Sequence, residues 1–123
     1  MKEEYLNKLT LAQRAVLANQ GTEPPFSGEL LHNKEQGTYH CAACGAELFN
    51  SETKYDSGSG WPSFYQVIKD KVEARLDLSQ DMQRTEVVCK NCGGHLGHVF
   101  DDGPRDKTGQ RYCINSRALN FKK

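Results

Sequence analysis

Residues 41–48 read Cys-Ala-Ala-Cys-Gly-Ala-Glu-Leu, and residues 89–96 read Cys-Lys-Asn-Cys-Gly-Gly-His-Leu. Both stretches, here called the two knuckles, follow the pattern C-x-x-C-G-x-x-L and form a weak internal repeat. Two residues between cysteines allow both thiolates to reach one ion. The glycine that follows lets the chain turn back, so that amides point at the sulfurs. Two matched knuckles predict a single clasp.

The knuckles predict one structural zinc ion per chain, because four thiolates leave no open position for a substrate. The alternative is a pair of disulfides, or a redox pair of the thioredoxin kind. Zinc is favoured because the motif occurs twice and the acidic start of the chain does not resemble a secretory signal. The long separation of the knuckles predicts a domain folded between them. The expected ligands are Cys41, Cys44, Cys89 and Cys92.

Length and composition point to one domain that spans residues 1–123. Hydrophobic residues make up 37% of the chain, and 16 Lys and Arg balance 16 Asp and Glu. With no basic excess to neutralise phosphates, we expect no nucleic-acid partner. The sequence has no apolar run of the roughly 20 residues that a membrane span needs. We therefore expect a cytoplasmic protein that acts as a monomer away from membranes.

The fold is expected to be mainly β, because short β-type runs alternate with turn signals from residue 37 onward and favour antiparallel hairpins. A helix is expected only near the N-terminus, where Thr10 and Gln13 can form a capping box and Gly21 can end the helix. The prolines in residues 23–28 predict an ordered loop. The expected strands cover residues 38–40, 47–49, 65–68, 85–88, 98–100, 112–114 and 118–121.

The fifth cysteine, Cys113, lies outside the knuckles. On a strand, Arg111 and Asn115 share its face. A nearby guanidinium can lower the pKa of a thiol from about 8.5 and so favour the reactive thiolate. The alternative is a small hydrophobic residue in the core. The spacing alone leaves both interpretations open.

His95 and His98 follow the second knuckle with H-x-x-H spacing. They can be catalytic zinc ligands only if they displace cysteines. They can also be polar hairpin residues satisfied by the backbone, or a proton source for Cys113. Trp61 is the single tryptophan. Most lone tryptophans anchor a core, but the glycines before it and the proline after it favour a ring that grips small apolar groups at a loop surface.

Taken together, these motifs resemble the B-type (SelR-like) methionine sulfoxide reductases, oxidoreductases that reduce the R epimer of methionine sulfoxide in proteins. The resemblance extends from about Leu9 to Phe121. It rests on the two knuckles and on four further stretches: residues 21–28 (GTEPPFSG), 55–64 (YDSGSGWPSF), 94–104 (GHLGHVFDDGP) and 111–116 (RYCINS).

The resemblance implies two antiparallel sheets joined by the zinc clasp, and a role in protein repair under oxidative stress. It implies that Cys113 is the nucleophile and passes through a sulfenic acid. Trp61 and Phe100 are expected to hold the methyl group of the sulfoxide. The groups expected around the reacting oxygen are His95, His98, Arg111 and Asn115.

The sequence departs from many family members at Ser59, where they carry a resolving cysteine. Serine cannot form a disulfide, and resolution by a knuckle cysteine would break the clasp. We therefore expect thioredoxin or a small dithiol to reduce the sulfenic acid of Cys113 directly.

Two other functions are consistent with parts of the pattern. A zinc-ribbon binding module would use the knuckles as a scaffold for a protein partner, with Cys113 as packing. A zinc hydrolase would need His95 or His98 as a metal ligand. The first predicts no turnover, and the second predicts that the metal content depends on the histidines.

Overall fold

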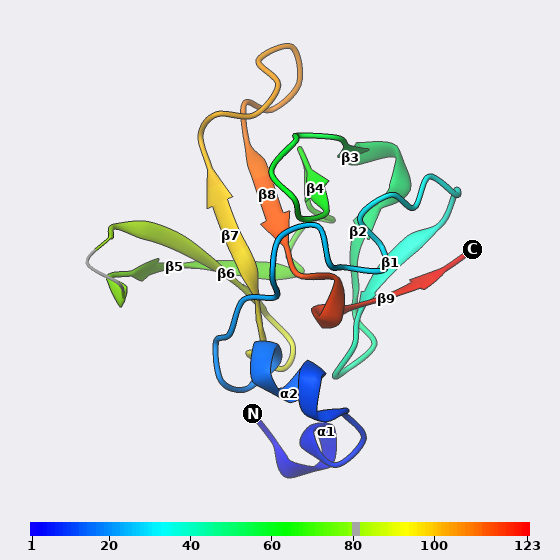
Figure 1. Ribbon diagram of the computed structural model, residues 1–123, viewed down its shortest axis with the longest axis vertical. Helices are drawn as coiled ribbons and strands as arrows, with labels where there is room; N and C mark the ends of the chain where they lie inside the picture. The colour runs from blue at the N-terminus through cyan, green and yellow to red at the C-terminus, as the bar shows by residue number, and fades with distance from the viewer. Residues whose placement is uncertain (80–81) are drawn as a thin grey trace.

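The computed structural model describes residues 1–79 and 82–123 and contains two antiparallel sheets, with the α-helices at the N-terminus (Figure 1). The mainly β prediction is confirmed. Of the helices that the structure describes, none has the length and apolar character needed to cross a membrane. The α-helices are α1 (Glu3–Leu6) and α2 (Leu11–Leu17).

The smaller sheet has the order β2-β1-β9 and the larger sheet has the order β3-β4-β8-β7-β6-β5. The strands of the smaller sheet are β1 (Thr38–Cys41), β2 (Glu47–Asn50) and β9 (Leu119–Lys122). Those of the larger sheet are β3 (Lys54–Tyr55), β4 (Ser63–Phe64), β5 (Val72–Asp77), β6 (Arg84–Cys89), β7 (His95–Phe100) and β8 (Arg111–Ile114). Two 3-10 turns, η1 (Ser51–Thr53) and η3 (Ser116–Ala118), precede β3 and β9.

Helix α2 begins as the sequence predicts. Thr10 is the N-cap, and its side chain and that of Gln13 make both hydrogen bonds of the capping box. The end of the helix differs from the prediction, because Gln20 rather than Gly21 takes the left-handed conformation, with φ of 58°. The Gln20 side chain then donates a hydrogen bond to Glu86 on β6, 3.2 Å away, which ties the end of the helical segment to the larger sheet.

The prediction of a strand over residues 65–68 is wrong. The amides of Tyr65 and Ile68 donate to Thr53 and Leu48 as isolated hydrogen bonds, so no ladder forms there. The larger sheet instead uses β4 just before this stretch and β5 after it. Strand β5 was not predicted because it lies at the edge of the sheet and its middle residues are exposed, which weakens the apolar alternation on which strand prediction depends.

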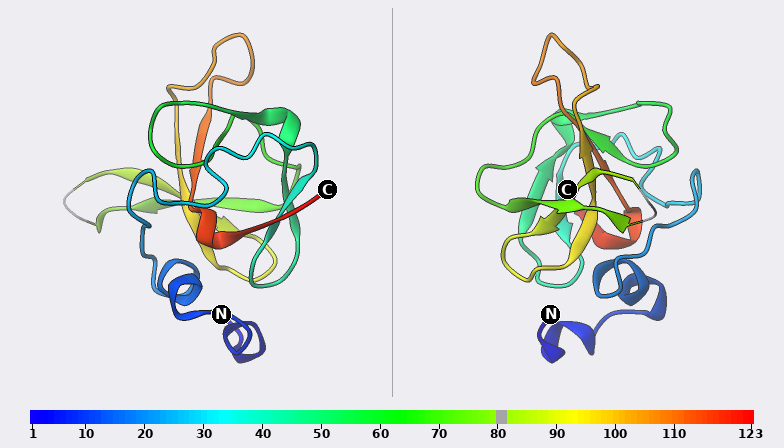
Figure 2. Two further views of the ribbon diagram at one scale, coloured as in Figure 1. Left: turned by 45° about the vertical axis from the view of Figure 1, so that its right-hand side comes forward. Right: turned by 90° about the vertical axis from the view of Figure 1, so that its left-hand side faces the viewer.

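The smaller sheet lies beside the larger one (Figure 2), and aromatic side chains join the two sheets in the core. The rings of Phe49 on β2 and Phe64 on β4 stack with centroids 4.3 Å apart, and Tyr39 on β1 meets Phe64 edge to face at 5.1 Å. All three side chains are fully buried. Offset stacking and edge-to-face contacts are the favoured aromatic geometries, so this cluster fixes β4 against the smaller sheet.

Strand β8 lies between β4 and β7, and this order positions the candidate site. The pairing places Ser63 of β4 on one side of Cys113 and His98 of β7 on the other. Directly paired residues of antiparallel strands project from the same face of the sheet. The topology therefore brings a hydroxyl, a thiol and an imidazole together from three strands.

Candidate active site

The four knuckle cysteines lie together at one end of the fold. The Sγ atoms of Cys41 and Cys92 are 3.7 Å apart, those of Cys44 and Cys89 are 3.6 Å apart, and all four sulfurs lie within 4.8 Å of one another. A tetrahedral ion with Zn–S bonds of about 2.3 Å places its sulfurs roughly 3.8 Å apart, whereas a disulfide requires about 2.05 Å. The sulfurs fit a metal ion, and all four cysteines are free of disulfides.

The backbone of the knuckles explains their shared sequence. Gly45 and Gly93 take left-handed conformations, with φ of 81° and 78°, which side chains with a Cβ rarely adopt. In the second knuckle the amide of Gly94 donates to the sulfur of Cys92 at 3.4 Å. The expected turn-back is therefore present in both knuckles, and one amide that points at a sulfur is present in the second.

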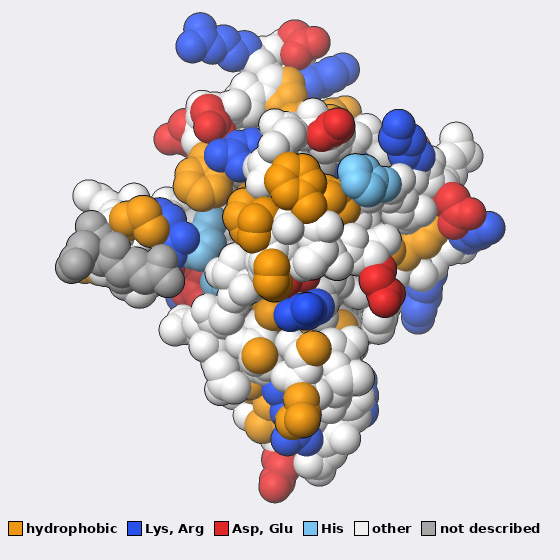
Figure 3. All heavy atoms as spheres, in the orientation of Figure 1, with side chains coloured by type: hydrophobic (Ala, Val, Ile, Leu, Met, Phe, Trp, Pro, Cys, Tyr) orange, Lys and Arg blue, Asp and Glu red, His pale blue; other side chains and the backbone are white. Residues whose placement is uncertain are grey.

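A cavity of about 270 Å³ opens beside β7 and β8. This volume is just below the usual range for ligand pockets, so it suits one side chain better than a large cofactor. On the face seen in Figure 3, hydrophobic side chains gather near a recessed histidine, next to the arm formed by β5 and β6. The lining includes six residues expected at the active site: Trp61, His98, Phe100, Arg111, Cys113 and Asn115.

Cys113 is half-buried and lines this cavity. Burial raises the pKa of its thiol above the ordinary value, and the hydrogen bond from Ser59 and the charge of Arg111 oppose that shift. Arg111 therefore lowers the pKa of Cys113 as expected, but the net shift of that pKa is upward. The sequence could not show this balance, because it depends on how deeply β8 is buried.

Arg111 is held by an ion pair that the sequence did not reveal. Its Nε donates to Asp102 at 2.8 Å and its second terminal nitrogen donates at 3.2 Å. This pairing lowers the pKa of Asp102. The guanidinium also lies over the ring of Phe100, 4.4 Å from its centroid. Part of the positive charge expected at Cys113 is therefore shared with a carboxylate and an aromatic face.

His98 reaches the cavity and is paired with Asp77 on β5. Its Nε2 lies 2.8 Å from Oδ2 of Asp77, which also accepts from Arg84 at 3.4 Å. Burial lowers the pKa of His98, while the contact with Asp77 works against that shift. The same contact holds the pKa of Asp77 well below its usual range. A neutral imidazole that donates Nε2–H to an ionised carboxylate accounts for both directions.

His95 lies behind the cavity and is not part of its lining. It is 3% exposed, and its Nδ1 lies 2.6 Å from Oε2 of Glu86, which also accepts from Gln20. Its Nε2 is buried and has no hydrogen-bond partner among the described residues. The ring lies 5.4 Å from that of His98, edge to face. In the described part of the chain, the four cysteines are the one cluster of three or more possible metal ligands, and neither histidine belongs to it.

The loop over residues 21–28 holds two sides of the cavity through Glu23. The main-chain carbonyl of Glu23 accepts from Nε1 of Trp61 at 2.9 Å, and its amide donates to Oδ1 of Asn115 at 2.9 Å. The buried Glu23 carboxylate accepts from the amide of Arg117 at 3.0 Å. Nδ2 of Asn115 donates to Leu96 at 3.0 Å, so this amide is bound at both ends to the backbone.

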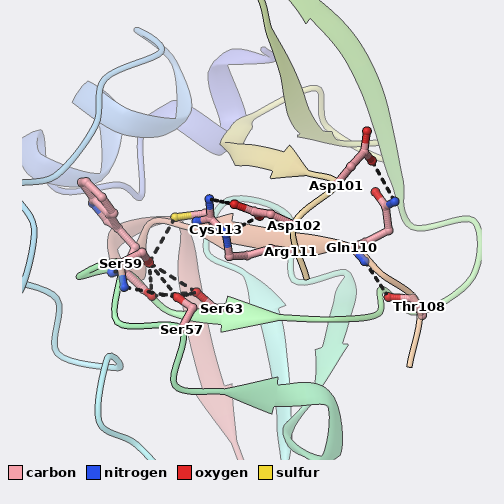
Figure 4. A network of polar contacts seen from close by, with 10 residues as sticks. Ser57, Ser59, Ser63, Asp101, Asp102, Thr108, Gln110, Arg111 and Cys113 are labelled. Carbon is pink, nitrogen blue, oxygen red and sulfur yellow. Dashed lines mark hydrogen bonds and ion pairs between the residues drawn. The ribbon is translucent and has the colours of Figure 1, made fainter. Parts of the chain in front are cut away.

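Sequence reasoning missed the acidic partners and two hydroxyls of the site. Asp77 and Asp102 were not singled out, because each acts through a side chain that only the folded sheet brings near. Glu86 gave a weak signal in the sequence, since a carboxylate followed by two valines in a predicted strand has to be paired when it is buried. The hydroxyls of Ser57 and Ser63 lie beside Ser59 and were not singled out (Figure 4).

Comparison with known proteins identifies the family. The SelR domain model matches residues 9–123. The chain belongs to the SelR domain family. Two similar proteins are each called "Peptide methionine sulfoxide reductase MsrB". The one from Methanosarcina barkeri is 61% identical and covers 98% of this chain and 85% of its own length. The one from Leptospira interrogans is 58% identical and covers 98% and 92%. The SelR-like resemblance predicted from the motifs is confirmed.

A solved structure shows that the fold of this SelR domain also occurs at much lower sequence identity. The Mis18 "Yippee-like" domain superposes with a TM-score of 0.58 at 15% identity, and the match covers 72% of this chain and 97% of that domain. At this identity the likeness concerns the fold alone.

Proposed function

We propose that this chain is an oxidoreductase that reduces the R epimer of methionine sulfoxide in proteins or peptides to methionine. The main support is the cavity, which places the free thiol of Cys113 beside a histidine, a tryptophan and a phenylalanine and has room for one side chain. Membership of the SelR domain family and the shared name of the two relatives support the same reaction.

In the proposed reaction, oxygen moves from the sulfoxide sulfur to the sulfur of Cys113. The thiol gives its proton to His98 as the sulfur attacks, and the resulting imidazolium gives that proton to the oxygen. The products are methionine and a sulfenic acid on Cys113, so one oxygen and one proton are accounted for. Asp77 supports this step by accepting Nε2–H of His98 and stabilising its charged form.

The other expected residues are assigned by where they lie. Trp61 and Phe100 hold the methyl group, which leaves one direction for the oxygen of a chiral sulfoxide and so selects the epimer. Arg111 and Asn115 also line the cavity and are proposed to face the reacting oxygen. His95 is proposed as a second proton source, because its Nδ1 is held by Glu86 and its Nε2 is buried with no hydrogen-bond partner among the described residues.

The metal proposed for the knuckles is zinc, held by Cys41, Cys44, Cys89 and Cys92. All-thiolate ligands suit zinc, and a complete shell gives the ion a structural role away from the reaction. Its proposed contribution is to clamp the end of β1 to the end of β6.

The sulfenic acid is proposed to be regenerated directly by thioredoxin or a small dithiol. One thiol forms a mixed disulfide with Cys113 and releases water, and the second thiol of the reductant then displaces Cys113. Ser59 supports this route, because its hydroxyl lies 3.8 Å from the Cys113 sulfur and cannot form a disulfide. The proposed setting is the reducing cytoplasm, where free thiols persist, and the proposed active form is a monomer.

The test is an assay that resolves the R and S epimers of a peptide methionine sulfoxide, with dithiothreitol as reductant. We expect turnover of the R epimer alone. A single turnover without reductant, followed by a sulfenic-acid trap and mass spectrometry, should label Cys113. Absence of turnover with both epimers would reject the proposed function, and an internal disulfide at Cys113 would reject the proposed regeneration.

A further inference from the structure

Three serine hydroxyls form a connected chain that ends at the sulfur of Cys113 (Figure 4). The Oγ atoms of Ser63 and Ser57 are 2.6 Å apart, and Ser57 donates to Ser59 at 2.8 Å. The Oγ of Ser59 then lies 3.8 Å from the Sγ of Cys113. Ser63 is buried and pairs directly with Cys113 across β4 and β8, so the start of the chain is fixed by the sheet.

The hydrogen bonds along the three serines can all point toward Cys113. Each hydroxyl carries one proton, and a thiolate can only accept. When Cys113 is ionised, Ser59 donates to the sulfur and Ser57 donates to Ser59. Ser63 then donates to Ser57 at 2.6 Å, which is closer than its other acceptor, the Trp61 carbonyl at 3.1 Å. Hydrogen bonds aligned in one direction polarise one another and strengthen the last donor. Two other acceptors lie within reach of the Ser59 proton, the carbonyl of Trp61 and the hydroxyl of Ser63, each 3.5 Å away.

Charged groups near Cys113 do not replace this donor. The guanidinium of Arg111 makes two hydrogen bonds to Asp102, which divides its charge between two partners. Ser59 is the largest influence that lowers the pKa of Cys113, ahead of Arg111, and the charges of Glu23 and Asp102 raise it. The titratable groups that face the thiol are therefore Arg111, Asp102, Glu23, Tyr55 and His98.

We propose that Ser59 is a catalytic residue that hydrogen-bonds the thiolate of Cys113, and that Ser57 and Ser63 are positioning residues that turn the Ser59 hydroxyl toward the sulfur. The proposal deepens the proposed function, since it assigns the group that stabilises the nucleophile of that same site. It also gives Ser59 a role of its own at the position where many family members carry a resolving cysteine.

The test measures the thiol without using the sulfoxide reaction. The rate of Cys113 alkylation by iodoacetamide is followed by peptide mass spectrometry over a pH series, with the metal-loaded protein. We expect S59A to raise the thiol pKa by about one unit, because the thiolate loses a hydrogen bond. We expect S57A to raise it by a smaller amount and S59T, which keeps the hydroxyl, to stay near the parent value.

A matched control separates this effect from general disturbance. The Ser51 hydroxyl accepts one hydrogen bond, from the amide of Gly37 at 3.0 Å, and Ser51 does not line the cavity. S51A should leave the alkylation pKa unchanged, and melting temperature and metal content should report folding for every variant. S63A is less informative because Ser63 is fully enclosed.

The outcomes are distinct. An S59A profile that coincides with the S51A profile overturns the role of Ser59. A shift in S59A with none in S57A overturns the relay and leaves Ser59 acting alone. Either result can occur in a protein that reduces sulfoxide normally, so failure of this proposal is distinguishable from failure of the proposed function. If the proposal holds, S59A should also reduce kcat/KM near neutral pH by about tenfold.

Discussion

The chain uses its cysteines in two different ways, four in the knuckles and one on β8. Each knuckle sulfur has other sulfurs as neighbours, within 4.8 Å, and lies at a turn that glycine makes possible. The sulfur of Cys113 has a hydroxyl on one side and lines a cavity. The neighbours of a thiol therefore decide its chemistry, since soft ligands gather around a metal whereas a lone thiol among proton donors can act as a nucleophile.

Removing the proposed zinc should have the largest effect, because it acts on the whole fold. Metal binding in small structural zinc sites contributes roughly 10 kcal/mol or more, comparable with the total stability of a domain. We expect a strong chelator to abolish the cooperative melting transition seen by circular dichroism. C41S should behave in the same way and lose stoichiometric zinc by elemental analysis. A chelated protein that melts as before would show that the knuckles are not a structural clasp.

The opposite pattern is expected for Cys113, and this pair of results would establish the comparison most directly. C113S should lower kcat/KM for methionine R-sulfoxide by about 10³-fold or more, because the nucleophile is lost. Its melting temperature and zinc content should match those of the parent protein. Retained turnover in C113S would show that Cys113 is not the nucleophile. The proposed contrast between Cys113 and the knuckle cysteines would then fail.

A smaller effect should follow from changing the support of His98. In D77N the imidazole loses its charged acceptor, and because that contact raises the pKa of His98, the pKa should fall further below its usual value. We expect kcat to drop by about 10²-fold, the typical contribution of general acid–base catalysis. Imidazole NMR titration checks the pKa, and D106N at an exposed loop position provides the control. A raised His98 pKa in D77N would contradict the assigned pairing.

The sequence predicted the features that depend on spacing along the chain. The knuckles follow from C-x-x-C-G repeated twice, the start of α2 follows from Thr10 and Gln13, and Cys113 follows from subtraction of the other cysteines. Each of these patterns has a local physical cause. The mainly β fold was predictable for the same reason, because alternation and turn residues act over short distances.

The features that the sequence did not reveal depend on pairing between distant segments. Asp77 reaches His98 because β5 folds back along β6, and β5 itself lacked a clear apolar pattern. Arg111 looked like a free cation because nothing local shows that Asp102 accepts both of its hydrogen bonds. The raised pKa of Cys113 likewise depends on burial, which only the assembled sheets determine.

The smallest change in rate, and the finest test of the comparison, should come from S59C. This variant places a sulfur where the hydroxyl now lies 3.8 Å from the Cys113 sulfur. We expect the sulfenic acid formed in a single turnover to condense with the introduced thiol and release water, because the two groups are direct neighbours. Mass spectrometry should then show a disulfide between Cys113 and the introduced thiol in place of the trapped sulfenic acid. The rate of the first turnover should fall only a few-fold, because a thiol is a weaker hydrogen-bond donor than a hydroxyl. A knuckle cysteine in the disulfide, with loss of zinc, would instead mean that the two sulfur regions communicate and that the separation between them is incomplete.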